Sequence, residues 1–164
     1  MGRLDNKVAI ITGAASGMGL AAVQLFISEG AKVVATDIAF DQLEEVTAVI
    51  EGDILCARLD VTSDEEWKTV MEQTKEAFGK IDILINNAGV SFHKTLLEET
   101  LDGWNRTINL NLTSVFLGMQ SVIPYMQENV GGSIVNCVCL AAIIGSADNG
   151  AAAYAAAKGG VRSL

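Results

Sequence analysis

Short apolar runs, rich in β-branched residues, recur along the chain, and a longer helical pattern follows each of them. The expected strands span residues 7–12, 31–37, 54–61, 81–89 and 133–139, the fourth running into a turn. These runs are apolar throughout instead of alternating with polar residues, which is typical of a parallel sheet covered by helices on both faces. Strict alternation of strand and helix with short loops predicts right-handed crossovers. We therefore expect an α/β fold with a doubly wound parallel sheet.

The composition is that of a folded domain. Half of the 164 residues are hydrophobic, 19% are charged and one is proline, a balance that argues against disorder. Nothing reads as a linker or a low-complexity tract, so we expect residues 1–164 to belong to a single domain, incomplete at its C-terminus. The three cysteines do not suggest a disulfide framework, and their spacing does not suggest a metal site.

Charge and hydropathy exclude two classes of partner. A formal net charge of -9 opposes nucleic-acid binding, which needs basic stripes. No apolar run is long enough to span a membrane, and the first seven residues are too charged for the core of a signal peptide. We expect a soluble, cytoplasmic protein with no nucleic-acid or membrane partner.

A glycine-rich turn, TGAASGMG, follows the first expected strand and opens a helical pattern. Residues without a Cβ let the backbone approach a pyrophosphate closely, and the start of a helix offers free N–H groups and a positive dipole. The alternative is a turn in which the glycines serve packing alone. The cofactor residues expected in this turn are Gly13, Ser16, Gly17, Met18 and Gly19.

Asp37 ends the second expected strand, about twenty residues beyond the glycine turn. A carboxylate there accepts hydrogen bonds from an adenosine ribose and repels a 2′-phosphate, so the sequence favours NAD over NADP. Ile38, the next residue, is assigned to the same site. Lys32 lies at the start of the strand, at the opposite end from Asp37, and so is badly placed to offset the repulsion between Asp37 and a 2′-phosphate. The alternative role for Asp37 is a turn aspartate that caps the following helix.

Three motifs in this order, TGAASGMG, NNAG and YAAAK, resemble the short-chain dehydrogenase/reductase family over essentially the whole chain. The resemblance implies a Rossmann-like fold, NAD as cofactor, and interconversion of a secondary alcohol and a ketone. It places further residues on the cofactor: Asp60, Val61, Asn87, Ala88 and Gly89. It also makes Asn111 the proton-relay residue, although Asn109 lies two residues away.

The resemblance makes Tyr154 and Lys158 both catalytic and cofactor-binding. They are four residues apart, which places them on one face of a helix. Removing a hydride from an alcohol requires a base for its hydroxyl proton, and free tyrosine, with a pKa of about 10, is too weakly acidic. A nearby ammonium and the positive nicotinamide should lower that pKa. The alternative is a chance pair on a helix face.

One catalytic position departs from the family pattern. Where the family usually has a serine that hydrogen-bonds the substrate oxygen, this chain aligns Cys139, with a spacing to Tyr154 about two residues longer than usual. Ser146 follows and is the alternative donor. A thiol is the weaker donor, so we expect a slowed step.

Only five strands can be identified, whereas the family continues after the lysine helix with further strands and a substrate lid. We therefore expect a C-terminally truncated Rossmann-like sheet. The family also implies a homo-oligomer that pairs its long helices, and a small alcohol or ketone as substrate. The alternative function is a non-catalytic or impaired NAD-binding or association module.

Overall fold

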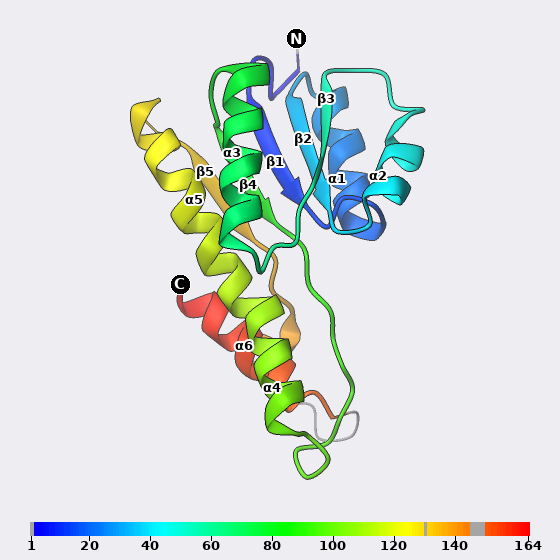
Figure 1. The fold of residues 1–164 in the computed structure, drawn as a ribbon, viewed down its shortest axis with the longest axis vertical. Coiled ribbons are helices and arrows are strands. Elements are labelled where there is room, and N and C mark those ends of the chain that lie inside the picture. The colour runs from blue at the N-terminus through cyan, green and yellow to red at the C-terminus, as the bar shows by residue number, and fades with distance from the viewer. Residues whose placement is uncertain (1, 130, 145–149) are drawn as a thin grey trace.

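The computed structural model describes residues 2–129, 131–144 and 150–164. Its strands form one parallel sheet in the order β3-β2-β1-β4-β5 (Figure 1). They are β1 Val8–Thr12, β2 Lys32–Asp37, β3 Ile54–Arg58, β4 Ile83–Asn86 and β5 Ser133–Asn136. The chain runs outward from β1 to β3 and then returns to the other side of β1. The predicted doubly wound, Rossmann-like α/β sheet is confirmed.

Helices cover both faces of this sheet, and each face has its own core. The helices are α1 Gly17–Ser28, α2 Phe40–Thr47, α3 Asp64–Phe78, α4 Leu101–Ile108, α5 Ser114–Glu128 and α6 Ala152–Ser163. On one face Val23 of α1 and Leu43 of α2 are fully buried against β1 and β2. On the other face Trp67 of α3 and Val122 of α5 are fully buried. The strands are apolar throughout because both of their faces are covered.

Two expected strands extend beyond the observed ones. β3 ends at Arg58 instead of residue 61, and β5 ends at Asn136 instead of residue 139. The partner of β3 is β2, which ends at Asp37, and the partner of β5 is β4, which ends at Asn86. The apolar sequence pattern continues past these points, but among the described residues there is no partner strand left for the backbone to pair with. The residues after each strand therefore lie at the carboxyl edge of the sheet, where ligands bind in folds of this type.

The long helical pattern over residues 101–129 is two α-helices joined by a π-helical turn, η1 (Asn109–Thr113). Such a turn inserts one extra residue into the helix and is often found at functional sites. Figure 1 shows α4 and α6 side by side below the sheet, with β5 leading down toward them. This arrangement brings the end of the chain to the carboxyl ends of the central strands.

Candidate active site

A cleft of about 480 Å³ opens at the carboxyl ends of the central strands, where the strand order reverses around β1. Its lining includes eleven of the residues assigned from the sequence: Gly13, Ser16, Gly17, Met18, Asp37, Ile38, Asp60, Val61, Asn87, Ala88 and Gly89. Leu59, Val90 and Leu110 also line it and were not predicted. Leu59 and Val90 adjoin motif residues, whereas Leu110 reaches the cleft only through the packing of η1.

The glycine turn is shaped by close contacts with the segment after β4. Asn87 Nδ2 donates to the carbonyl oxygens of Thr12 and Gly13, at 2.9 and 3.2 Å. Gly13 has φ 67, and a Cβ there would lie 2.9 Å from Asn87 Nδ2. A Cβ on Gly19 would lie 2.0 Å from the Gly13 carbonyl oxygen. Gly19 therefore packs beneath the turn and does not line the cleft, so the alternative role of packing fits this one glycine.

Thr12, at the end of β1, joins the two halves of the sheet and was not assigned from the sequence. Its buried Oγ1 accepts from the backbone N–H groups of Asn87 and Ala88, both at 3.0 Å. The same hydroxyl lies 3.4 Å from the Ile85 carbonyl oxygen, to which it donates. These bonds fix the NNAG segment beside the glycine turn. A hydroxyl at the end of a strand that enters a glycine turn is the signal that could have identified it.

The Asp37 carboxylate is fixed at the cleft by two backbone donors. Oδ2 accepts from Ala15 N and Oδ1 from Ala39 N, each at 3.0 Å. Ala39 is the residue before the first residue of α2, so Asp37 also orders the start of that helix, as the alternative role required. The structure thus shows the helix-ordering role of Asp37 and places its carboxylate in the lining of the cleft.

Asn111, within η1, is fully buried and connects the helix to the segment after β4. Its Oδ1 accepts from Val90 N at 3.1 Å, and its Nδ2 donates to the carbonyl oxygens of Val90 and Thr107 at 2.9 and 3.0 Å. Asn109 is exposed. Asn111 therefore contacts the segment after β4 at the cleft, whereas Asn109 faces solvent.

Lys158, in α6, is 4% exposed, and its Nζ donates to the Cys137 carbonyl oxygen at 2.8 Å. A Cβ on Gly89 would lie 3.5 Å from Lys158 Nζ and 2.7 Å from Asn111 Oδ1. Three residues from distant parts of the sequence therefore meet at one end of the cleft. Burial lowers the pKa of Lys158, an effect opposed by the nearby thiols of Cys137 and Cys139.

The electrostatics of Tyr154 differ from the expectation. Burial, together with a hydrogen bond to the Cys139 thiol, raises the pKa of Tyr154 to about 12. Lys158 Nζ lies 5.7 Å from the centroid of the Tyr154 ring and is engaged with a backbone carbonyl instead. The expected lowering of the tyrosine pKa depends on the lysine and the positive nicotinamide together, and in this arrangement desolvation dominates the tyrosine pKa.

Cys139 follows β5 and lies beside Tyr154, as the alignment to the family serine predicts. Ser146, the alternative donor, lies outside the described residues. Across the described ranges no group of three or more histidine, cysteine or acidic residues is arranged to hold a metal ion. None of the helices described is long and apolar enough to cross a membrane.

Comparison with known proteins agrees with this geometry. Residues 7–164 match the family described as short chain dehydrogenase. The chain belongs to that family. The short-chain dehydrogenases are oxidoreductases that usually bind nicotinamide cofactors, and this chain shares both their sheet and their motifs.

Individual relatives show how similar this chain is to known proteins in sequence and in structure. The chain is 40% identical over 165 residues to 2,5-dichloro-2,5-cyclohexadiene-1,4-diol dehydrogenase of Sphingobium indicum, covering 99% of this chain and 65% of that protein. It is 41% identical over 164 residues to a 3-oxoacyl-acyl-carrier-protein reductase of Thermotoga maritima, covering 97% and 65%. The crystal structure of a short chain dehydrogenase from Mycobacterium smegmatis superposes with a TM-score of 0.94 at 33% identity, covering 100% and 70%. The chain thus spans about 65% of the length of these curated relatives.

Proposed function

We propose that this chain carries the cofactor site and the catalytic residues of an NAD(H)-dependent oxidoreductase that interconverts a secondary alcohol and a ketone. The observation that carries the proposal is the meeting of Asn111, Gly89 and Lys158 beside Tyr154, at one end of a cleft that a glycine turn and Asp37 line at the other. The family membership supports the reaction class, and the cofactor and residue roles are part of the proposal.

The residues of the cleft fit a dinucleotide. The N-terminus of α1, starting at Gly17, offers N–H groups to a pyrophosphate, and the space where a Cβ of Gly17 would project is open. The Asp37 carboxylate, held by two backbone N–H groups, would accept a ribose hydroxyl and disfavour a 2′-phosphate. Asp60 and Val61 would flank the adenine. Bound NAD supplies the hydride acceptor, and NADH the donor.

In the oxidative direction Tyr154 would take the hydroxyl proton of the substrate while the carbinol C–H bond breaks, and bound NAD would supply the acceptor for the hydride. In the reductive direction Tyr154 would return that proton to the forming alkoxide. Because burial raises the pKa of Tyr154 to about 12, this residue needs added positive charge to ionise near neutral pH. The Lys158 ammonium supplies part of that charge, Asn111 would relay the proton onward, and the Cys139 thiol would hydrogen-bond the substrate oxygen.

The test is formation of NADH from a panel of secondary alcohols, including cyclohexanol and a 3-hydroxyacyl thioester. Tyr154→Phe should lower turnover by about 10²- to 10⁴-fold, the usual contribution of a general acid–base group, while NAD still binds. Tyr125→Phe removes the hydroxyl of the other tyrosine, on α5, and serves as the matched control. Full activity of the Tyr154 variant would refute its role.

Binding of NAD without turnover of any alcohol in the panel would favour the alternative, a binding or association module. We also propose that the protein is a homo-oligomer, because the long helix α5 leaves Phe116 and Ile123 exposed. Sedimentation velocity would measure its assembly directly.

A further inference from the structure

The loop after β3, formed by Leu59, Asp60 and Val61, makes one wall of the cleft. Under the proposed function, on which this inference rests, that wall receives the adenine. The loop leaves the sheet after Arg58, so no strand ladder fixes it beyond the bond from Leu59 N to the Asp37 carbonyl oxygen. Its shape therefore depends on contacts with the first turn of α3.

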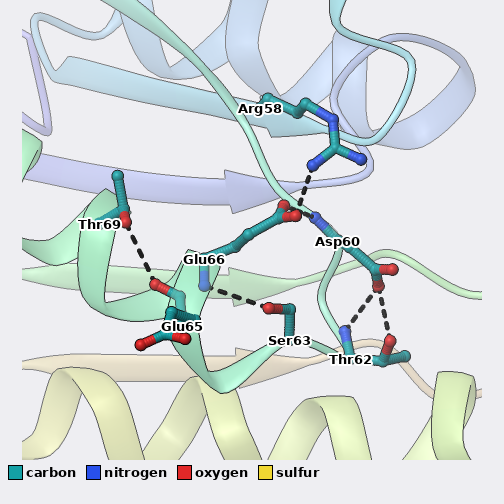
Figure 2. A network of polar contacts seen from close by, with 7 residues as sticks. All are labelled: Arg58, Asp60, Thr62, Ser63, Glu65, Glu66 and Thr69. Carbon is teal, nitrogen blue, oxygen red and sulfur yellow. Dashed lines mark hydrogen bonds and ion pairs between the residues drawn. The ribbon is translucent and has the colours of Figure 1, made fainter.

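Glu66, the third residue of α3, provides the central contact. Its Oε2 accepts from the backbone N–H of Asp60 at 2.6 Å, and its Oε1 accepts from Arg58 Nη1 (Figure 2). The sequence predicts a capping box with Ser63, and one half of it is present, since Ser63 Oγ accepts from Glu66 N at 3.2 Å. The other half, a bond from Ser63 N to the Glu66 carboxylate, is not formed, because Ser63 N donates to the Asp60 carbonyl oxygen at 2.9 Å. The glutamate side chain reaches the cleft loop instead.

The remaining groups of Asp60 are held locally. Its Oδ1 accepts from both the backbone N–H and the hydroxyl of Thr62, at 2.9 and 2.7 Å (Figure 2). Among the described residues, no group hydrogen-bonds its other oxygen, Oδ2. An adenine amino group is a donor that matches a carboxylate oxygen of this kind. The direction of that oxygen is set by the Asp60 backbone, and the Asp60 N–H is bonded to Glu66.

The neighbouring residue of α3 reinforces the contact. Trp67 is fully buried, and its Nε1 donates to the Val61 carbonyl oxygen at 3.0 Å. Glu66 and Trp67 thus bond to two consecutive loop residues, Asp60 and Val61, from one helical turn. A charged acceptor makes hydrogen bonds roughly twice as strong as a neutral one, so Glu66 is the stronger of the two restraints.

We propose that Glu66 is a positioning residue of the cofactor site, which fixes the adenine wall by holding the Asp60 backbone. Glu66 itself does not line the cleft. Its loss should therefore weaken binding of the adenosine part of the cofactor without changing the chemistry at Tyr154. The effect should appear with any ligand that carries adenosine, including AMP and ADP-ribose.

The experiment is calorimetric titration of the protein with NAD, ADP-ribose and AMP. Glu66→Met retains the length of the side chain but has no carboxylate, and we expect all three dissociation constants to rise about tenfold. Glu66→Gln retains an acceptor for Asp60 N and should stay within about threefold of the unaltered protein. Glu65→Met is the matched control, since the Glu65 side chain makes no contact with this loop in Figure 2.

Turnover at saturating NAD separates positioning from general damage, because Glu66→Met should raise the KM for NAD and leave kcat unchanged. If that variant does not fold, Glu66→Asp keeps the charge at the start of α3 but is one methylene too short to reach Asp60 N, and it should weaken AMP binding similarly. If the dissociation constants of Glu66→Met equal those of Glu65→Met, the inference is overturned and the proposed function is unaffected. Failure of the unaltered protein to bind any adenosine ligand would overturn the proposed function, and the inference with it.

Discussion

The two ends of the cleft are built in different ways. At the cofactor end, the glycine turn and the loop after β3 each come directly after a strand, and Asp37 is the last residue of β2. Most of their hydrogen bonds involve backbone groups close to those strand ends. At the catalytic end, Gly89, Asn111 and Lys158 come from segments more than twenty residues apart, and helix packing brings them together. The cofactor end follows from local βα geometry, whereas the catalytic end requires the tertiary fold.

The electrostatic character of the two ends differs as well. Asp37 is partly exposed, and two backbone N–H groups donate to its carboxylate. Lys158 is buried and Tyr154 is partly so, and burial moves the pKa of each group toward its neutral state. A cofactor that brings charge into the cleft would therefore act mainly on the pKa values of Tyr154 and Lys158, at the catalytic end.

Among the tests that compare the two ends, the largest expected effect concerns the cofactor end. Asp37→Ser should raise the affinity for NADP relative to NAD by at least about tenfold, because the carboxylate that repels a 2′-phosphate is removed. Fluorescence titration of both dinucleotides measures the ratio. Asp37→Asn, which retains the shape and one acceptor oxygen without the charge, separates repulsion from lost hydrogen bonds. An unchanged ratio in both variants would assign cofactor selection to another residue.

An intermediate effect tests the catalytic end. Cys139→Ser replaces a weak donor beside Tyr154 with a stronger one, and turnover should rise about three- to tenfold, part of the contribution of a full oxyanion donor. Steady-state kinetics at saturating NAD provide the measurement. Cys137→Ser is the matched control and should not raise turnover, because the Cys137 side chain packs against the core on the α1 face. A lower rate for the Cys139 variant would contradict the role of the thiol.

The smallest expected effect concerns alkaline stability. The pKa of Tyr154 is about 12 in the folded chain and about 10 when unfolded, so the unfolded state releases its proton first as pH rises. This contribution to stability is complete below pH about 10 and is lost as pH approaches about 12. Solvent screening keeps it below roughly 1 kcal/mol. Thermal melting of the unaltered protein and Tyr154→Phe should show the unaltered protein falling relative to the variant over that range. Parallel curves would contradict the raised pKa.

Much of the cofactor end was predictable because its signals are local. Apolar runs identified the strands, and a residue that directly follows a parallel strand must lie at the carboxyl edge of the sheet. Thr12 was missed because its role depends on the N–H groups of Asn87 and Ala88, which follow β4 and lie more than seventy residues away in the sequence. The spacing of Glu66 from Ser63 fits a capping box, whereas its bond to Asp60 depends on the path of the loop.

The sequence by itself determined the order of strands and helices, the family motifs and the helical spacing of Tyr154 and Lys158, because these depend on residue type and spacing along the chain. Only the tertiary structure decided that Asn111 and not Asn109 is buried at the site, that Lys158 turns toward the Cys137 carbonyl, and that the pKa of Tyr154 rises. Those properties depend on burial and on distances between residues remote in sequence. Such quantities exist only once the helices have packed.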